Sequence, residues 1–546
     1  MRRVFVGLAA LASCVWLLAA APVAGAKVKV LRVGTYHGIR GQYKSIQAAV
    51  NHAKPGDFIL IAPGDYKTRS WKFPKRSGHQ FPAGVLIQTR DLTLRGMSRH
   101  SVIVDGTKRG TPRCSDKKFA QNFGPKVKRG RAGLNGIMVW KADNVNVENL
   151  TACNFLGGSG GDGATGNEIW WNGGAGSGNI GGWGYYGAYL TATSTWYDTK
   201  VSPQQAEVSA ATYGIFSSNW DGGTWDHSYA SNFNDSGYYI GACQQECNQV
   251  VNHAWAEYNA LGYSGSNSGG SLVVKNSQFD NNEDGFDTNS QNGDNPPPQN
   301  GACPNNGISP ITHTNSCWVF MDNYVHNNND PDVPTAGFAA AGPVGTGMSV
   351  SGARNDTVMN NRFENNGAWG NILVPFPDSG PPCTGGIGTP PSYPSCVFDE
   401  YGDAVIGNHY KNDGFFGNPT NGDFEATNFE PDEPTDCFSG NTEIGGGSIT
   451  PEDQILETEY PTCDGAAVAP DVNAEFVAEA LCDTQISVSG GATGPCPPGS
   501  NYPRFSESKI HDGLHKLPPK RELKSMPHPC QGVPRNPWCR APKNKK

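Results

Sequence analysis

The stretch NNEDGFDTNSQNGD (281–294) concentrates carboxyl groups in a background of Gly and Asn. Asp284 and Asp287 flank a glycine and are close enough in sequence to share a hard cation such as calcium through oxygen ligands. Glu283 and Asp294 could complete such a shell. The segment therefore predicts a calcium site formed by Glu283, Asp284 and Asp287. The alternatives are a solvated bend and a purely structural calcium.

Aromatic residues gather in the Gly-rich segment NEIWWNGGAGSGNIGGWGYYGAYLTATSTWYD (167–198). Flat amphipathic rings suit stacking against the CH-rich faces of sugars, so this segment is a candidate substrate-binding surface. The alternative is that the rings fill coil ends or cover a sheet face. The predicted substrate-binding residues are Trp170, Trp171, Trp183 and Tyr185.

The N-terminus is typical of an exported protein. A basic start, a long apolar run and the small residues of Ala24-Gly25-Ala26 predict a signal peptide over residues 1–26. The alternative is lipid anchoring through Cys14, because Leu11 to Cys14 resembles a lipobox. The rest of the chain has no comparable apolar run, so we expect a secreted protein without a membrane span after signal removal.

Of the 15 cysteines, Cys14 lies in the signal, and the even number that remains in an exported chain predicts disulfides. Zinc is disfavoured because His partners are missing at ligand spacing. Copper is disfavoured because Met numbers only seven and no Met/His or Cys/His cluster is evident. The close cysteine neighbours are Cys243/Cys247, Cys303/Cys317, Cys383/Cys396, Cys437/Cys463, Cys482/Cys496 and Cys530/Cys539.

The net charge of −8 is unevenly distributed. Acids dominate from Asp399 to Asp483, whereas a Pro-rich tail from Arg504 to Lys546 is basic. We expect this tail to dock on the acidic region or on an anionic cell surface. Nucleic acid is not an expected partner of an exported, acidic chain.

A repeat with a period in the low twenties must position the acids of residues 281–294. Three segments with a final Gly align without gaps: WDHSYASNFNDSG (225–237), VVNHAWAEYNALG (250–262) and VVKNSQFDNNEDG (273–285). The alignment places Asn234, Asn259 and Asn282 in one column, which Asn328 and Asn366 continue after insertions. Gly, Asn and β-branched residues disfavour helices, so the repeat predicts a solenoid of short strands. Coils stacked ~4.8 Å apart would let the Asn amides hydrogen-bond in a ladder.

The start of the mature chain predicts a different element. Ile46, Ala49, Val50 and Ala53 recur at helical spacing, so Ser45 to Lys54 is expected to be a short amphipathic helix. Pro55-Gly56 ends it, and Phe58 to Ala62 is an apolar strand.

The segments IQAAVNHAKPGDFILIAPGDY, LTLRGMSRHSVIVDG and NGIMVWKADNVNVENLTACNF resemble the right-handed parallel β-helix, or pectin-lyase-like, superfamily over roughly residues 30–425. The resemblance implies an all-β, right-handed parallel β-helix solenoid with an N-terminal capping helix and an irregular cystine-rich C-terminal region. The expected organisation is a signal peptide (1–26), an N-terminal cap with the first coils (27–134), the parallel β-helix (135–425), an acidic cystine-rich cap or loops (426–500) and a basic Pro-rich tail (501–546).

The same superfamily holds lyases, glycosidases, esterases, epimerases and non-catalytic proteins, so the resemblance is specific for fold alone. The Asp-Gly-x-Asp pattern of residues 284–287 resembles a calcium-binding turn of one β-helical pectate lyase family. There, calcium neutralises a uronate carboxylate while a Lys removes the C5 proton before β-elimination. Carried over, Asp284 and Asp287 would bind calcium. Lys275 is the nearest candidate base, although its polar column neighbours suggest that it faces solvent.

Two carboxylates facing one groove could instead support glycoside hydrolysis. Asp235 takes the place of Glu283 two repeats earlier, roughly 10 Å away by strand spacing. We predict a secreted protein that binds an acidic polysaccharide and cleaves it by metal-assisted β-elimination, with Asp235 and Lys275 as catalytic candidates. The alternative is a non-catalytic surface or extracellular β-helix protein that binds a cell-wall glycan.

Overall fold

The computed structural model describes residues 28–539 with internal gaps. The predicted signal peptide, Cys14, Cys463 and Asp294 lie outside the described residues. The gaps are residues 69–70, 75–80, 161–164, 175–178, 202–204, 207, 293–297, 335–341, 379–382, 388–395, 430–433, 435, 452–455, 461–472, 485–495, 504–513 and 515.

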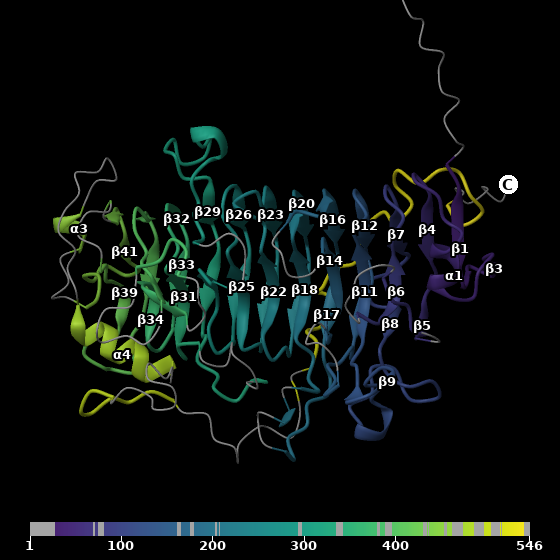
Figure 1. The fold of residues 1–546 in the computed structure, drawn as a ribbon, viewed down its shortest axis with the longest axis horizontal. Helices are drawn as coiled ribbons and strands as arrows, with labels where there is room; N and C mark the ends of the chain where they lie inside the picture. Colours follow the sequence, from purple (N-terminus) through teal and green to yellow (C-terminus); the bar gives the residue numbers. More distant parts are fainter. Residues whose placement is uncertain are drawn as a thin grey trace, which may run out of the picture.

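The chain winds into coils of three short strands, and equivalent strands of successive coils pair in parallel to form three long sheets (Figure 1). Sheet 1 has 12 strands in the described chain, and its strands from β4 to β37 each lead through a turn into sheet 2 and then into sheet 3. Crossovers between parallel strands are right-handed. The fold is therefore the predicted right-handed parallel β-helix.

Sheet 1 contains, in order, β1 (Val30–Val33), β4 (Phe58–Ile61), β7 (Thr93–Gly96), β12 (Val145–Glu148), β16 (Tyr185–Ala188), β20 (Gly223–Asp226), β23 (Gln249–Asn252), β26 (Leu272–Lys275), β29 (Trp318–Met321), β32 (Asp356–Met359), β37 (Ala404–Ile406) and β40 (Cys437–Ser439). Sheet 2 contains β5 (Gly64–Lys67), β8 (Val102–Asp105), β13 (Thr151–Cys153), β17 (Thr191–Thr193), β21 (Tyr229–Ser231), β24 (Trp255–Glu257), β27 (Gln278–Asp280), β30 (Tyr324–His326), β33 (Arg362–Glu364), β38 (His409–Lys411) and β41 (Thr442–Glu443). Sheet 3 contains β6 (Ala83–Ile87), β11 (Asn135–Trp140), β14 (Ile169–Asn172), β18 (Tyr213–Ser218), β22 (Ser236–Gly241), β25 (Leu261–Ser266), β28 (Asp287–Asn289), β31 (Thr346–Ser351), β34 (Trp369–Val374) and β39 (Gly422–Ala426).

Several short strands and helices lie outside the three long sheets. Three antiparallel pairs and one parallel pair lie outside the long sheets, together with short helices. They are β2 (Thr35–Tyr36) with β3 (Ile39–Arg40), β9 (Lys126–Val127) with β10 (Gly130–Arg131), β35 (Phe376–Asp378) with β36 (Cys396–Phe398), β15 (Gly182–Trp183) with β19 (Trp220–Asp221), the 3-10 helices η1 (Lys118–Ala120) and η2 (Pro304–Asn306), and the helices α1 (Ile46–Val50), α3 (Leu456–Glu459) and α4 (Ala474–Thr484).

The helix α1 closes the N-terminal end of the stack, as predicted. Ser45 caps it by accepting a hydrogen bond from Ala48 N at 3.4 Å, and its apolar face packs into the core. The helix is shorter than the predicted Ser45–Lys54 segment. Among the described residues, no helix combines the length and the apolar character needed to cross a bilayer.

A file of buried asparagines runs through the turns from sheet 2 to sheet 3. The Nδ2 of Asn259 donates to Asn282 Oδ1 at 3.0 Å, Asn282 to Asn328 at 3.0 Å, and Asn328 to Asn366 at 3.1 Å. These bonds confirm the predicted ladder, because each amide satisfies the next one in a position closed to water.

Asn234 is not part of this file, which corrects one member of the predicted column. Ser231 pairs with Glu257 but Ser236 pairs with Leu261, so the earlier coil has one extra residue in its turn. Phe233 takes the ladder position, and its backbone N donates to Asn259 Oδ1 at 3.1 Å. The gapless alignment missed this single insertion.

Glycines form a second file beside the asparagines. Gly237, Gly262, Gly285, Gly347 and Gly370 occupy equivalent positions in sheet 3. A Cβ on any of the middle three would come within 2.4 Å of the carbonyl oxygen of the next glycine in the file. The Gly that ends each repeat is therefore required by close packing between coils.

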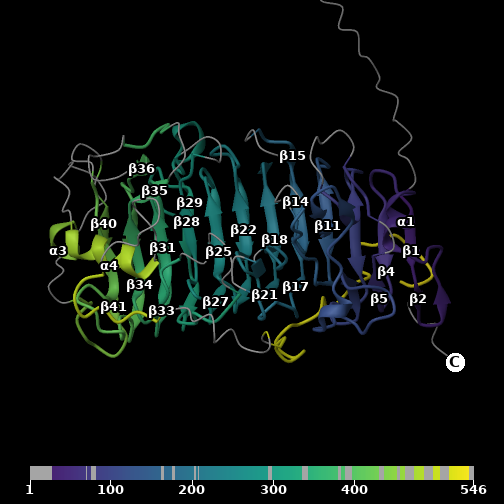
Figure 2. The same cartoon turned by 60° about the horizontal axis from the view of Figure 1, so that its bottom comes forward.

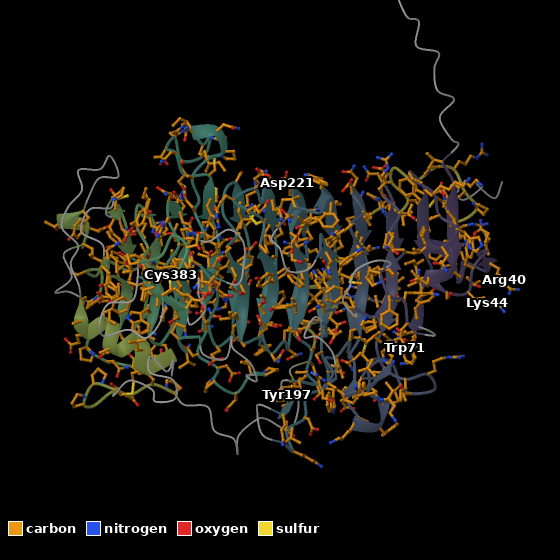
Figure 3. All side chains as sticks on the ribbon, in the orientation of Figure 1. Arg40, Lys44, Trp71, Tyr197, Asp221 and Cys383 are labelled. Atoms are coloured by element: carbon orange, nitrogen blue, oxygen red, sulfur yellow. A yellow bond between two sulfur atoms is a disulfide. The ribbon has the colours of Figure 1, made fainter. Side chains whose placement is uncertain are left out.

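The disulfides confirm five of the six predicted pairs: Cys243–Cys247, Cys303–Cys317, Cys383–Cys396, Cys482–Cys496 and Cys530–Cys539. Cys437 is also disulfide-bonded, and its predicted partner lies outside the described residues. Cys114–Cys153 is an additional bond that the sequence analysis did not pair. Figure 3 places Cys383 toward the C-terminal end of the stack.

The C-terminal region differs from prediction in two ways. The stack continues past residue 425, because β40 and β41 add to sheets 1 and 2, and α4 then packs on sheet 3 through Phe476 and Ala480 (Figure 2). The basic tail does not dock on the acidic region where it is described. Instead, Trp538 packs against Leu60 and Met97 near the N-terminal end.

Candidate functional site

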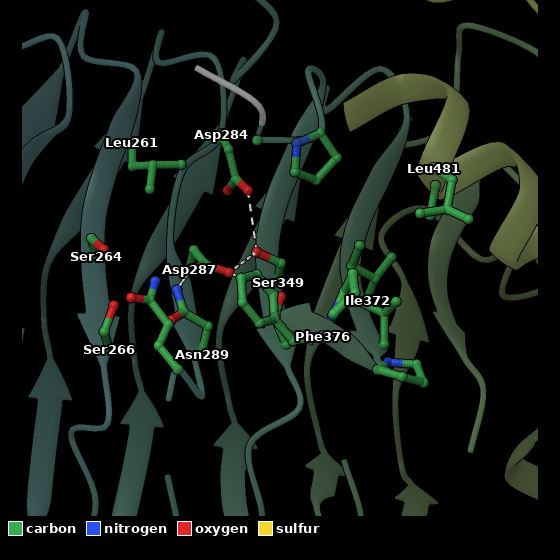
Figure 4. A pocket seen from close by; sticks show the side chains of 18 of the residues that line it. Leu261, Ser264, Ser266, Asp284, Asp287, Asn289, Ser349, Ile372, Phe376 and Leu481 are labelled. Carbon is green, nitrogen blue, oxygen red and sulfur yellow. Dashed lines mark hydrogen bonds between the residues drawn. The ribbon is translucent and has the colours of Figure 1, made fainter. Parts of the chain in front are cut away.

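A cavity of about 450 Å³ lies on the outer face of sheet 3 (Figure 4). Its floor comes from β22, β25, β28, β31 and β34, and its walls include Phe376 of β35, Val397 of β36 and Leu481 of α4. The volume is within the range of small-molecule sites. Asp235, Asp284 and Asp287 all line it.

The alternation of strand β28 explains why Asp287 faces outward. Asp287 pairs with Ser264 on one side and Ser349 on the other, and all three line the cavity. The preceding Phe286 points inward and stacks on Tyr263 with ring centroids 4.1 Å apart. Since neighbouring side chains of a strand face opposite sides, burying Phe286 fixes Asp287 on the cavity side.

A single serine connects the two acids. Ser349 Oγ lies 2.7 Å from Asp287 Oδ1 and 3.2 Å from Asp284 Oδ2 (Figure 4). A hydroxyl carries one proton, so it can donate to only one of two carboxylates at a time. The geometry is satisfied when a protonated Asp284 donates to Ser349 and Ser349 donates to an ionised Asp287.

The surroundings of the two acids favour the same assignment, with Asp284 protonated and Asp287 ionised. Burial and then the charge of Asp287 raise the pKa of Asp284 well above its ordinary value, against hydrogen bonds from Phe286 N and Ser349. Burial also raises the pKa of Asp287, but donors from Asn289, Ser349 and Ser351 lower it. Two neighbouring carboxyls with unequal environments are typical of an acid–base pair.

Asp235 is the third acid of the cavity. It precedes β22 and lies two coils from Asp284, because Ser236 pairs with Leu261 and Leu261 bridges to Asp284. Among the described residues that line the cavity there is no Lys, Arg or His. The site is therefore acidic and largely apolar, with Tyr213 and Tyr239 on its wall.

Glu283 does not line the cavity, although the sequence analysis grouped it with Asp284 and Asp287. Its carboxyl is buried, and burial, then Asp483, Asp284 and Asp330, raise its pKa well above the ordinary value. This environment keeps Glu283 separate from the acid pair that Ser349 connects.

The acid pair does not fit calcium. Calcium takes six to eight oxygen ligands, whereas the described cavity residues bring only two carboxyl groups together, those of Asp284 and Asp287, with Asp235 two coils away. Among the described residues, no group of three His, Cys or acidic ligand atoms within 4.8 Å of one another includes Asp284 or Asp287. We therefore derive no step through a metal here.

Lys275 is not brought to this site. It ends β26 in sheet 1, in file with Asp226 and Asn252 through the strand pairing, and it is not among the cavity residues. The predicted base for β-elimination is thus on a different sheet from the acids. This placement corrects the assignment of Lys275.

The predicted aromatic surface is mostly interior. Trp171 and Tyr185 are stacked 4.6 Å apart inside the coil, and this burial excludes them from sugar contact. Trp170 faces outward but is 4% exposed, stacked on Phe216. Trp183 is 51% exposed and remains a candidate contact residue outside the cavity.

Sequence reasoning missed the residues that complete the site. Ser349, Ser351 and Asn289 supply the hydrogen bonds that distinguish the two acids. The serines lie in β31, which follows a long insertion after β30. Their only signal in the sequence is a strand pattern that begins at Thr346-Gly347, where Gly347 is one of the stacked glycines.

Comparison with known proteins finds distant structural similarity alone. No family model and no curated protein matches the chain. Solved structures similar to it include the A-module of the mannuronan C-5 epimerase AlgE6 from Azotobacter vinelandii, with 13% identity, coverage of 74% of this chain and 86% of that one, and a TM-score of 0.40. An alginate lyase from Paenibacillus sp. str. FPU-7 has 12% identity, 77% and 97% coverage, and a TM-score of 0.34. An exopolygalacturonase from Thermotoga maritima has 8% identity, 72% and 81% coverage, and a TM-score of 0.37.

Proposed function

We propose that this protein is an exported enzyme that hydrolyses glycosidic bonds, with Asp284 as the proton donor and Asp287 as the ionised carboxylate. The observation that carries the proposal is the Ser349 hydroxyl, which bridges these two unequal carboxyls inside a cavity. Export is supported by the disulfides, which form and persist in oxidising compartments.

Asp284 is suited to general acid catalysis because burial raises its pKa and so favours its protonated form. It gives that proton to the glycosidic oxygen as the bond from this oxygen to the anomeric carbon breaks. Positive charge develops on the sugar in this transition state. The buried carboxylate of Asp287 faces that charge and stabilises it.

The spacing of the two carboxyls favours the retaining route. The two contacts of Ser349 place one oxygen of Asp284 and one of Asp287 at most about 6 Å apart, which is below the inverting range of about 6.5–9.5 Å. Asp287 then bonds to the anomeric carbon. Water displaces it and returns its proton to Asp284, so each cycle consumes one water and regenerates both residues.

The cavity walls indicate the class of sugar. Apolar side chains such as Ile372, Phe376 and Leu481, with Tyr239, offer surfaces for the CH faces of a sugar ring. The described wall residues carry no positive group that could neutralise a uronate carboxylate. A neutral or esterified glycan is therefore favoured over the acidic polymer that the sequence analysis predicted.

The products of cleavage distinguish hydrolysis from elimination. Incubation with neutral polysaccharides, uronate polymers and their methyl esters is expected to release new reducing ends without unsaturated, ultraviolet-absorbing sugars. Each cleavage in ¹⁸O-labelled water should add one labelled oxygen at the reducing end. Since the proposed step uses no metal, a chelator should leave the rate unchanged.

Unsaturated products that disappear on chelation would contradict the proposal and restore the calcium-dependent lyase. Failure to cleave any polymer of the panel would favour the non-catalytic glycan-binding alternative. Proton NMR of the first product should show retention at the anomeric carbon, and an inverted product would instead assign the base to Asp235.

The pH profile follows from the two raised pKa values. Activity needs Asp287 ionised and Asp284 protonated, so kcat/KM should fall at low pH as Asp287 gains a proton and at high pH as Asp284 loses one. Ser349 lowers the pKa of Asp287 by donating a hydrogen bond to it. Ser349→Ala should therefore move the acidic limb to higher pH, by about one unit or less. If Ser349→Ala lowered kcat/KM without shifting its pH dependence, Ser349 would not control the pKa of Asp287.

A further inference from the structure

Two histidines and an aspartate gather on the outside of the stack, at the turns from sheet 1 to sheet 2. His227 follows β20 and His253 follows β23, so the two occupy equivalent turns of successive coils. Both have positive φ, at 51° and 50°, and their rings stack with centroids 4.5 Å apart. None of the three residues lines the cavity of the acid pair.

The ligand atoms of this cluster are arranged around one point. His227 Nδ1 lies 2.9 Å and His253 Nδ1 lies 3.4 Å from the same oxygen, Asp226 Oδ1. The ligand atoms of all three residues lie within 4.8 Å of one another. Ligands bonded about 2.0–2.1 Å from a metal are roughly 2.9 Å apart at a right angle and roughly 3.4 Å apart at the tetrahedral angle. The two separations from Asp226 Oδ1 match these values.

Ordinary hydrogen bonding accounts for His253, whose Nδ1 pairs with Asp226 Oδ1, but not for His227. The Nδ1 of His227 is closed to solvent and makes no hydrogen bond with the described residues, although Asp226 Oδ1 is only 2.9 Å away. The two atoms therefore do not have donor–acceptor geometry. A buried imidazole nitrogen left unpaired beside a carboxylate oxygen is a position that a bound cation would satisfy.

Neighbouring groups hold the carboxylate in place. Asn252 Nδ2 donates to Asp226 Oδ1 at 2.9 Å, and Tyr186 Oη donates to Asp226 Oδ2 at 3.4 Å. Tyr189, from the preceding coil, stacks on the other face of His227 with centroids 4.9 Å apart. Outer groups that orient a ligand in this way are typical of built metal sites.

We propose that Asp226, His227 and His253 bind one divalent transition-metal ion, with Zn²⁺ as the representative. Two imidazoles and one carboxylate are borderline ligands that suit Zn²⁺ better than Ca²⁺ or Mg²⁺. Three protein ligands leave a coordination position for water, and His227 and His253 are 38% and 48% exposed. The ion would link two successive coils, independently of the acid pair in the cavity.

The test is Zn²⁺ binding to the full, disulfide-bonded protein, prepared without a polyhistidine tag. Titration against a chromogenic chelator is expected to show one Zn²⁺ per chain, and Co²⁺ substitution should give visible d–d absorption. His227→Asn and His253→Asn should each weaken Zn²⁺ binding at least about tenfold. Asn is chosen because Asn276 occupies the equivalent turn of the next coil with φ of 50°, so the backbone conformation is preserved.

His313→Asn is the matched control, since His313 is exposed, has φ of 60° and lies outside the cluster. It should bind Zn²⁺ as the unmodified protein does. Unmodified protein that binds no Zn²⁺, or cluster variants that bind it as tightly as the control, would overturn the proposal. Circular dichroism of each variant confirms that a loss of binding is not a loss of fold.

Discussion

Asp284→Asn is expected to lower kcat on a polysaccharide by about 100- to 10,000-fold while changing KM little, because general acid catalysis contributes that much to a rate. The amide is nearly isosteric and still accepts the hydrogen bond from Phe286 N, which is 3.0 Å from Asp284 Oδ1. What it cannot do is give a proton to the departing oxygen. The measurement is the rate of reducing-end release under saturating substrate.

The leaving group provides the control within this experiment. An aryl glycoside whose phenol is already acidic needs no proton from the enzyme in the first step, so Asp284→Asn should retain most of its kcat/KM on it, while kcat still falls because the second step needs Asp284 as a base. Asp287→Asn should lose activity on both substrates, because the developing positive charge needs the carboxylate in either case. Equal losses of kcat/KM on both substrates for Asp284→Asn would contradict its assignment as the acid.

Glu283→Gln is the matched variant for the same series. Glu283 precedes Asp284 and is similarly buried, but it does not line the cavity. Its activity should remain within about threefold of the unmodified protein, as expected for a residue that neither contacts substrate nor positions the acids. A loss as large as that of Asp284→Asn would contradict the assignment of Asp284 as the acid.

The sequence is sufficient to predict the fold because the repeat imposes conditions that few architectures meet. Asn at a turn tolerates positive φ, and Asn281, Asn327 and Asn365 have φ of 54° to 58° immediately before the buried Asn of the file. The Asn that follows is then held by its equivalent in the next coil. Sequence spacing alone carries both requirements, so the solenoid could be predicted.

The register of individual coils was less predictable. The coil from Gly223 to Gly241 has one extra residue between Ser231 and Ser236. The gapless alignment is therefore correct after this turn and is shifted by one residue before it. The extra residue places Asp226, rather than His227, in file with Asn252 and Lys275. For the same reason, sequence spacing did not reveal that His227 and His253 meet in neighbouring coils.

Only some of the functional residues could be predicted. A sequence pattern locates a strand more reliably than it shows on which face of the strand a side chain lies. Trp170 and Trp171 are adjacent in β14 and must face opposite sides, so at most one of them could be on the surface. The acids broke the repeat and were therefore visible. Ser349 and Ser351 look like ordinary polar strand residues and become significant only when β31 is seen beside β28.

Gly285→Ala is expected to lower the free energy of unfolding by about 3 kcal/mol, a large loss for one methyl group. Gly285 does not have positive φ, so the cost is not conformational. The new Cβ would lie 2.4 Å from Gly347 O and 2.7 Å from Asn328 Nδ2. One of these groups belongs to the backbone of the next coil and the other to the buried Asn file, so neither can move without separating the coils.

The matched control is Gly447→Ala, where the added methyl group would meet the flexible side chain of Glu443 at 3.1 Å instead of a backbone oxygen. Its stability should change by no more than about 0.5 kcal/mol. Denaturant unfolding of the disulfide-bonded protein, followed by circular dichroism, measures both variants. If Gly285→Ala were as stable as the control, the coils would have to separate more easily than their shared hydrogen bonds and close glycine contacts allow. The acid pair would then lack the rigid floor on which its geometry depends, because Asp284 and Asp287 flank the segment that this glycine holds against the next coil.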